Sequence, residues 1–202
     1  DQRAVALASR GPVCVIAGAG TGKTRAITHR IAYAAAIGTM DPQKVLALTF
    51  TAKAAGEMRA RLRSLGVPTV AARTIHSAAL KQLLYFWPSV FGGRTPDLMT
   101  TKTGFLTEAI NRAGLSDSVR ATNRELMRDI ASEIEWAKVS QVAPSDYVDE
   151  ISKRMQKPRV LPEQMVQIYT AYESIKKQEL AIDFEDVLLL CAAMLEEERE
   201  VR

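Results

Sequence analysis

Cysteine and histidine are scarce in this 202-residue chain, and long apolar runs are missing. The cysteines are Cys14 and Cys191, there is no CxxC pair, and there are two histidines. This composition argues against a zinc site, and we expect two buried, reduced thiols. No apolar run approaches the roughly 20 residues that cross a bilayer, and no signal-peptide pattern opens the chain. We therefore expect neither membrane spanning nor secretion.

Acidic residues are scarce in the first part of the chain. Residues 1–86 hold 12 Lys and Arg against 3 Asp and Glu, whereas residues 87–202 hold 15 against 20. A basic segment fits a polyanionic partner such as nucleic acid or a nucleotide. The same charges are also typical of ordinary solvated helix faces, and charge alone does not decide between the two interpretations.

The first 86 residues alternate between short apolar runs and amphipathic segments. This alternation predicts an α/β fold with a parallel sheet, and the continuous apolar run at 44–50 indicates a sheet covered on both faces. The expected elements are a short buried strand that runs into a loop within 11–20, a helix at 24–38, a strand at 44–50, a helix at 52–66, a strand at 69–74 and a helix at 76–86.

The pattern changes at Trp87, after which we expect helices and no strand until about residue 180. The expected helices are 103–113, 122–138, 144–155 and 162–180. The second of these is the most strongly amphipathic. The chain then returns to the α/β part near residue 183, so a helical subdomain is inserted into an α/β domain.

A glycine-rich stretch, AGAGTGKT, joins the first expected strand to the first expected helix. Gly18, Gly20 and Gly22 allow the backbone N–H groups to approach phosphate oxygens closely. Lys23 supplies a positive charge, Thr24 supplies a hydroxyl for Mg²⁺, and the following helix contributes its N-terminal dipole. This stretch predicts a nucleotide-phosphate site.

Ala17 stands where the general phosphate-loop pattern has glycine, and A-G-A-G-[ST]-G-K-T is the spelling found in superfamily 1 helicases. Further stretches follow in the order of that family: DQRAV (1–5) resembles the Q motif, LTFTAKAAGEM (48–58) motif Ia, RTIHSAAL (73–80) motif Ib, and DFEDVL (183–188) the DFDDL element. The chain therefore resembles the N-terminal part of the UvrD/PcrA/Rep-like DNA helicases. The stretches LKQLLYFW and EIEWAKVS are similar to the actinobacterial UvrD-like branch.

The resemblance implies a P-loop NTPase fold. Residues 1–86 and 183–202 would form an incomplete RecA-like parallel sheet, called domain 1A, and residues 87–182 an inserted all-helical subdomain, called 1B. It also implies an ATP-dependent DNA helicase that uses ATP and Mg²⁺. The expected partners are single-stranded DNA, junctions of single- and double-stranded DNA, and a second RecA-like domain, in the bacterial cytoplasm at the nucleoid.

The resemblance also assigns roles to individual residues. Gln2 and Arg25 would hold the adenine base, Lys23 and Thr24 would be the catalytic residues, and Thr24 would also bind Mg²⁺ through its hydroxyl. The full nucleotide-binding set is Gln2, Ala19, Gly20, Thr21, Gly22, Lys23, Thr24 and Arg25. The DNA-binding set is Thr49, Phe50, Thr51, Lys53, Thr74 and His76.

Several of these positions also have a plainer interpretation. Phe50 would either stack on a base or close the core at the end of its strand, and the motif favours stacking. Lys53 would contact a phosphate or only water, and we expect His76 to contact a phosphate or cap a helix rather than act as a base. The acidic residues at 183–186 suggest a metal site, but we expect them to stabilise a helix N-terminus. The Asp-Glu pair at 149–150 lies in helical sequence and is not expected to bind Mg²⁺.

ATP hydrolysis needs a strand-borne aspartate for Mg²⁺, an acid that positions water, and usually an arginine finger. The resemblance places these groups after DFEDVL and in a second RecA-like domain. We therefore expect a fragment that hydrolyses no ATP by itself. Its parent would be a 3′→5′ DNA helicase or translocase acting in repair or replication, of which this is the ATP- and DNA-binding N-terminal part. The alternatives are a subunit of a RecB/AddA-type helicase–nuclease, a non-catalytic DNA-binding or docking module, and a small-molecule kinase. The motif Ia and Ib residues argue against the kinase.

Overall fold

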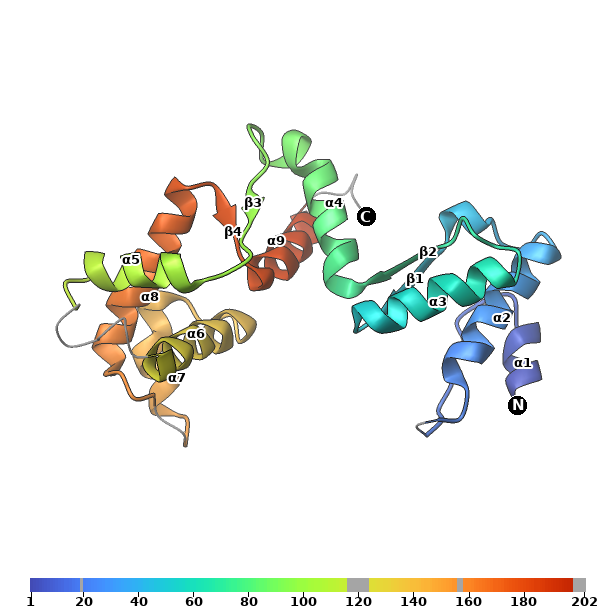
Figure 1. Cartoon of the computed structure of the whole chain (residues 1–202), viewed down its shortest axis with the longest axis horizontal. Coiled ribbons are helices and arrows are strands. Elements are labelled where there is room, and N and C mark those ends of the chain that lie inside the picture. Colours follow the sequence, from blue (N-terminus) through green and yellow to red (C-terminus); the bar gives the residue numbers. More distant parts are fainter. Residues whose placement is uncertain (19, 116–123, 156–157, 198–202) are drawn as a thin grey trace. The chain divides into compact units, whose positions relative to one another are not determined.

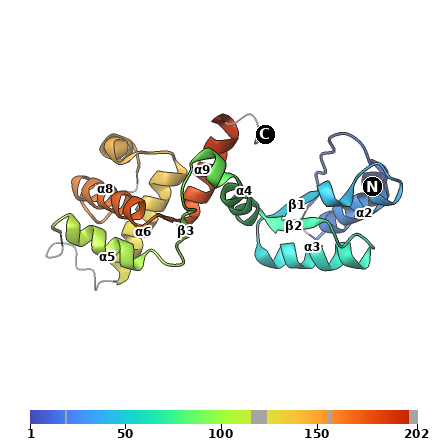
Figure 2. The same cartoon turned by 90° about the horizontal axis from the view of Figure 1, so that it is seen from above.

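The computed structural model divides the chain into two compact units, residues 1–78 and residues 79–202. It describes every residue except 19, 116–123, 156–157 and 198–202. Figures 1 and 2 show the two units as ribbons, and each is described by itself. In the described part of the chain, no helix is both long enough and apolar enough to cross a membrane.

The first unit is a small parallel sheet with one helix packed along it and further helices beside that helix. Its elements are α1 (Gln2–Leu7), α2 (Lys23–Ala36), the 3₁₀ turn η1 (Pro42–Lys44), β1 (Leu46–Thr49), α3 (Ala52–Ser64), β2 (Ala71–Thr74) and the start of α4 (Ile75–Val90). β1 pairs in parallel with β2, with Leu46 opposite Ala71 and Thr49 opposite Thr74. Figure 2 shows α3 running along this pair of strands. The fold class predicted from the sequence is confirmed, and the buried core consists of Ile31, Ala47, Met58, Leu62, Val67, Val70 and Ala72.

Glycine ends both long helices of this unit. Gly38 and Gly66 have φ values of 70° and 82°, in the left-handed region that side chains with a Cβ avoid. At the end of α3 the N–H of Gly66 donates to the carbonyl of Arg63 at 3.1 Å, and the N–H of Val67 donates to that of Leu62 at 3.0 Å. Because Val67 and Leu62 are both buried, this turn also directs the chain from α3 into β2.

The strand expected at 11–20 does not form. No strand is assigned between residues 12 and 18, and Val13 and Ile16 are 37% and 96% exposed. Cys14 is exposed as well, so the prediction of a buried thiol is wrong there, whereas Cys191 is buried. A strand needs a neighbour that accepts and donates backbone hydrogen bonds.

An apolar cavity accounts for the missing neighbour. It has a volume of about 410 Å³, and its lining includes Val13 and Val15 together with residues 45–48, three of which belong to β1. The expectation of a sheet covered on both faces is also not met, because Leu46 and Leu48 are 52% and 47% exposed while Ala47 between them is buried. Side chains alternate between the faces of a strand, and only the Ala47 face of β1 meets the helices.

The second unit contains the helical part of the chain. Its elements after α4 are β3 (Asp97–Leu98), α5 (Thr103–Arg112), α6 (Arg124–Val139), the 3₁₀ turn η2 (Pro144–Asp146), α7 (Tyr147–Ser152), α8 (Pro162–Gln178), β4 (Ala181–Ile182) and α9 (Phe184–Glu197). The four helices expected between 103 and 180 are present. The prediction of no strand before residue 180 is wrong, because β3 pairs in parallel with β4. A strand of two residues is too short to leave a periodic signal in the sequence.

This unit has two separate hydrophobic cores. One lies among the residues between 99 and 175. There α5, α7 and α8 pack against the face of α6 that carries Ile130, Ile134 and Ala137. The other joins α4 to β4 and α9 and consists of Leu83, Ile182, Val187, Cys191 and Met194. The helical core is therefore continuous in sequence, whereas the second core combines two segments about 100 residues apart.

Two glycines of α3 and its C-terminal turn should respond to alanine in opposite directions. Gly66→Ala should lower the free energy of unfolding by about 1 kcal/mol, because its φ of 82° is strained for alanine. Gly56→Ala should raise it by about 0.5–1 kcal/mol, because Gly56 lies inside the helix and an added Cβ would approach only Arg59 Nη2, at 4.0 Å. Urea unfolding of the two variants measures both changes, and equal shifts would contradict the assigned backbone conformations.

Candidate functional site

The glycine-rich loop leads directly into the N-terminus of α2. Gly20 and Gly22 have φ values of 74° and 86°, and Gly22 is the residue that precedes the helix. An added Cβ at Gly20 would meet nothing within 4 Å, so the backbone is open to a ligand there. The first N–H groups of a helix have no partner within it, and α2 therefore presents free donors and a positive dipole end beside this loop.

Gln2 of α1 lies against this loop. Its Nε2 donates to the carbonyl of Thr21 at 2.8 Å, and a Cβ on Gly22 would lie 2.5 Å from the same nitrogen. Arg30 of α2 holds the chain that links α1 to the loop, because its Nε and Nη2 donate to the carbonyls of Ala8 and Gly11 at 2.6 and 2.8 Å. The absence of a side chain at Gly22 thus allows Gln2 to reach the loop.

Lys23 lies inside the loop. Its Nζ donates to the carbonyls of Ala17 and Gly18 at 2.8 and 2.5 Å, and Thr21 Oγ1 also donates to the carbonyl of Gly18, at 2.8 Å. The ammonium group is thereby held against the carbonyl groups of the loop. The exposed hydroxyl of Thr24 follows on the first turn of α2.

Two cavities adjoin the loop. One, of about 340 Å³, is lined on one side by Gln2 and Val5 of α1 and on the other by Cys14 to Ala17 and the start of α2. The other, of about 280 Å³, contains Gly20, Gly22, Lys23, Thr24 and Arg25. An open glycine backbone, a fixed cation and an exposed hydroxyl on one helix end suit a nucleotide phosphate with its Mg²⁺. Ala19, part of the predicted nucleotide-binding set, lies outside the described residues.

The predicted DNA-binding residues gather at the carboxyl ends of β1 and β2. Because Thr49 is opposite Thr74 in the parallel pair, the residues that follow both strands lie at one edge of the sheet. Phe50 is 91% exposed, so it does not close the core. Lys53 and His76 are also exposed.

The threonines at this edge fix the two helices that follow. Thr51 Oγ1 accepts from the N–H of Ala54 at 3.2 Å and caps α3, and Thr49 Oγ1 donates to the carbonyl of Thr51 at 3.0 Å. Thr74 Oγ1 accepts from the N–H of Ser77 at 3.1 Å and caps α4. The caps anchor the turns that carry Phe50 and His76.

Comparison with known proteins agrees with this arrangement. The family described as UvrD/REP helicase N-terminal domain matches residues 1–202. The chain belongs to this family. It is 43% identical, over all of its length, to proteins named ATP-dependent DNA helicase UvrD2 from Mycobacterium tuberculosis and Mycobacterium bovis, and it covers 30% of each. It is 31% identical over 90% of its length to an ATP-dependent DNA helicase PcrA from Leuconostoc citreum, of which it covers 24%. The chain thus spans less than a third of the length of these relatives.

The DFEDVL stretch of this UvrD/REP-family domain forms the start of α9, as expected. The carboxylate of Asp183 accepts from the N–H of Asp186 at 2.9 Å, and the carboxylate of Asp186 accepts from the N–H of Asp183 at 3.0 Å. This reciprocal pair is a capping box. The predicted capping role is therefore confirmed. The neighbouring pair Asp149–Glu150 lies in the helix α7 and not on a strand, also as expected.

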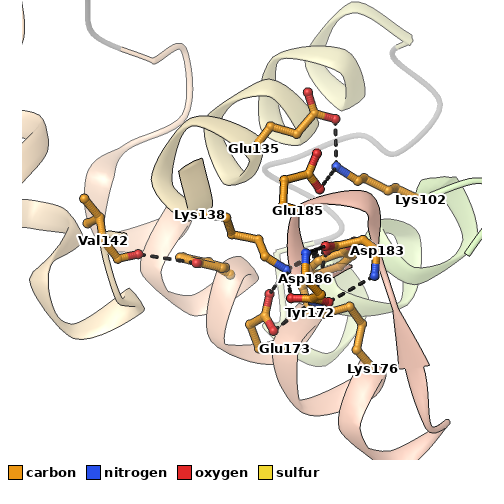
Figure 3. A network of polar contacts seen from close by, with 11 residues as sticks. Lys102, Glu135, Lys138, Val142, Tyr172, Glu173, Lys176, Asp183, Glu185 and Asp186 are labelled. Atoms are coloured by element: carbon orange, nitrogen blue, oxygen red, sulfur yellow. Dashed lines mark hydrogen bonds and ion pairs between the residues drawn. The ribbon is translucent and has the colours of Figure 1, made fainter. Parts of the chain in front are cut away.

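Two lysines bind this capping box, which the sequence did not suggest. Figure 3 shows the ammonium groups of Lys138 and Lys176, from the last turns of α6 and α8, directed at the box. Lys138 Nζ lies 2.8 and 2.7 Å from the two carboxylate oxygens of Asp183 and also donates to Asp186. Lys176 Nζ lies 2.9 Å from Asp183 Oδ2 and 2.6 Å from Asp186 Oδ2. We call these four residues the ionic cluster.

Further polar groups surround the ionic cluster. Tyr172 donates its hydroxyl to Asp183 Oδ2 at 3.1 Å, and the carboxylate oxygens of Glu173 lie 3.3 Å from Lys138 Nζ and 3.0 Å from Lys176 Nζ. Beside it, Lys102 Nζ bridges Glu135 and Glu185 at 2.7 Å each. Glu173, Asp183 and Asp186 are close enough together to bind a metal ion. The ammonium groups of Lys138 and Lys176 offset two of these three negative charges and contact all three carboxylates, so the arrangement does not require a metal ion.

Burial and charge act in opposite directions on the pKa values of this cluster. Burial alone would raise the pKa of Asp183, but the charges of Lys138 and Lys176 outweigh it and hold that pKa well below its ordinary value. Burial would lower the pKa of Lys138, but the charges of Glu173, Asp183 and Asp186 outweigh it and raise that pKa. Asp183 and Lys138 are therefore both charged at neutral pH.

Replacing Lys138 should destabilise the domain strongly. Lys138→Met leaves buried carboxylates with one lysine fewer and should lower the free energy of unfolding by about 3 kcal/mol or more. The matched control is Arg94→Met, which breaks an ion pair with Asp97 whose side chains are 70% and 74% exposed and should cost less than about 0.5 kcal/mol.

The pH dependence provides a second readout of the same variant. Because the pKa of Asp183 is lowered on folding, its contribution is fully present above the unfolded value of about 4 and is lost as the pH falls toward the folded value. The stability difference between the native chain and Lys138→Met should therefore shrink below about pH 4. A difference that stays constant from neutral to strongly acidic pH, measured by urea unfolding, would contradict the cluster.

Proposed function

We propose that the chain is the nucleotide- and single-stranded-DNA-binding N-terminal part of an ATP-dependent 3′→5′ DNA helicase or translocase. The observation that carries this proposal is the joint presence, in one unit, of a glycine loop with Lys23 held against its carbonyl groups and a sheet edge that exposes Phe50. The names of the curated relatives support the class of enzyme. Repair or replication at the bacterial nucleoid is the proposed setting.

In this proposal the nucleotide lies along the loop. Gln2 and Arg25 hold the base, Ala19, Gly20, Thr21 and Gly22 provide backbone contacts, and Lys23 offsets the charge of the phosphates. Thr24 would contribute its hydroxyl to Mg²⁺, which would neutralise negative charge on the phosphates. The position of Gln2 against Gly22, with its amide 2.8 Å from the loop carbonyl of Thr21, supports its role beside the nucleotide.

The domain organisation is part of the proposal. Residues 1–86 and 183–202 would belong to domain 1A, and residues 87–182 would form subdomain 1B. The two hydrophobic cores of the second unit support this division, because the buried residues of one all lie between 99 and 175 and the other joins Leu83 to the segment after residue 181.

The apolar cavity beside β1 is consistent with a RecA-like sheet to which another strand is added. Val13 and Val15 line it together with β1, so a further parallel strand there would pair with both and cover apolar surface. We propose that such a strand comes from the remainder of the protein and carries the acids that hydrolysis needs.

This part alone should show no ATP turnover, with or without single-stranded DNA. β1 and β2 end in Thr49 and Thr74, neither of which is followed directly by a carboxylate that would hold Mg²⁺ and orient water. Steady-state phosphate release measures this. DNA-stimulated release that Lys23→Ala abolishes would contradict the proposal and place a catalytic acid within these 202 residues.

Single-stranded DNA should bind to the Phe50 edge in a salt-dependent manner. Phe50→Ala should weaken binding of a fluorescent oligothymidine about tenfold, because one base loses its stacking partner. Tyr33→Ala, which removes a partly exposed aromatic ring from α2, is the matched control and should change binding less than about twofold. Fluorescence anisotropy at several salt concentrations measures both effects.

The salt dependence separates this proposal from the kinase alternative. Affinity for the oligothymidine should fall steadily as salt rises, because lysine and arginine displace cations from the phosphates. Absence of binding at low salt, or equal effects of the Phe50 and Tyr33 variants, would contradict the assignment of this edge to DNA.

A further inference from the structure

The cavity beside Thr24 is lined partly by the phosphate loop and partly by residues of α3. Its lining residues are Gly20, Gly22, Lys23, Thr24, Arg25, Glu57 and Arg61. Five of them belong to the loop and the first turn of α2, whereas Glu57 and Arg61 come from α3. The cavity therefore brings two charged side chains of the motif Ia helix to the proposed phosphate site.

Within the part of the chain that the structure describes, neither the Glu57 carboxylate nor the Arg61 guanidinium group forms an ion pair. The two residues are four apart on α3, a spacing at which opposite charges often pair. Arg59 differs, because its Nη1 donates to the carbonyl of Ala72 at 2.9 Å and ties α3 to β2. Arg61 thus faces the cavity with its donors available.

A simpler explanation for Arg61 is its place in the last turn of α3, where a positive charge offsets the helix dipole. Arg63 occupies the same turn and would serve the same purpose, but it does not line the cavity. The two arginines therefore share the dipole effect and differ in their access to the phosphate loop. This difference makes Arg63 the appropriate control for Arg61.

The charges of the cavity suit a polyphosphate better than a single phosphate. Lys23, Arg25 and Arg61 provide three cations against the one carboxylate of Glu57. A guanidinium group presents parallel N–H donors that match two phosphate oxygens. Glu57 places carboxylate oxygens in the same cavity as the Thr24 hydroxyl, and Mg²⁺ prefers oxygen ligands and bound water.

We propose that Arg61 is a further phosphate-binding residue, which contacts the outer phosphates of the nucleotide from α3, and that Glu57 accepts hydrogen bonds from the water around Mg²⁺. This assignment rests on the proposed nucleotide site. It makes α3, whose N-terminus follows Phe50 at the DNA edge, a direct link between nucleotide and DNA within one helix of 13 residues.

The test compares affinities for ATP, ADP and AMP in the presence of Mg²⁺. Dissociation constants are measured into the millimolar range by the shifts of backbone amide signals in NMR titrations of the 202-residue chain. Arg61→Ala should weaken ATP binding about tenfold and AMP binding less than twofold, because AMP lacks the outer phosphates. Arg63→Ala should change neither by more than about twofold. Both side chains are exposed, so the amide spectra should otherwise stay native.

Glu57 is tested through Mg²⁺. Glu57→Gln should strengthen the binding of metal-free ATP, because it removes a negative charge from the cavity, and should reduce the gain in affinity that Mg²⁺ brings. An unchanged ratio between the dissociation constants with Mg²⁺ and with EDTA would contradict the role of Glu57.

Failure of this inference is distinguishable from failure of the proposed function. If Lys23→Ala abolishes ATP binding while Arg61→Ala behaves like Arg63→Ala, the phosphate site stands and Arg61 is not part of it. The same holds if Arg61→Ala weakens ATP and AMP equally. If the native chain shows no saturable shifts with ATP, both the nucleotide site and the role of Arg61 are contradicted.

Discussion

The parallel pairing of β1 with β2 is the constraint on which the first unit depends. Four residue pairs, from Leu46–Ala71 to Thr49–Thr74, set the register, and a slip by one residue would move Ala47 and Ala72 out of the core. Because both strands end at the same edge, Phe50, which follows β1, and His76, in the first turn of α4 after β2, are brought to one side of the sheet. The helix caps by Thr51 and Thr74 then fix the directions in which α3 and α4 leave the sheet.

The second unit depends on buried ion pairs at the start of α9, where most domains use apolar contacts. Its two hydrophobic cores do not merge, and the ionic cluster lies at the start of α9, bound by the C-terminal turns of α6 and α8. Buried ion pairs contribute little net stability but are costly to break. They also restrict the position of the Asp183 carboxylate closely, because it accepts hydrogen bonds from two lysines, a tyrosine and a helix N–H at the same time. The cluster therefore fixes the direction in which α9 begins.

The sequence predicted the elements whose signals are local. The amphipathic face of α6 and the capping role of Asp183 both follow from short-range chemistry, and each is confirmed. The strand at 11–20 is the clearest failure, because strand formation depends on a neighbour that no local pattern reveals. Strand β3 was missed because it has two residues.

The ionic cluster was also missed, although a signal for it exists. In α6, Lys138 continues the row of buried residues Ile130 and Ile134 at intervals of four, and in α8, Lys176 follows Tyr172 by four. A lysine at a core position indicates a buried acidic partner. The partner itself, 45 residues away for Lys138, is set by tertiary packing. For the phosphate loop the residue types were sufficient to predict a site, but not the contact of Gln2 with Gly22 or the approach of Arg61 to the cavity.

The central claim is that the loop before α2 binds the phosphates of a nucleotide. Hydrogen–deuterium exchange of the 202-residue chain, measured with and without Mg²⁺ and ATP, tests it most directly. Bound nucleotide should slow the exchange of the backbone amides between residues 17 and 25, which include the N–H groups at the start of α2, and should not change exchange between residues 99 and 112 in the helical core. Unchanged exchange in the loop at saturating nucleotide would contradict the account.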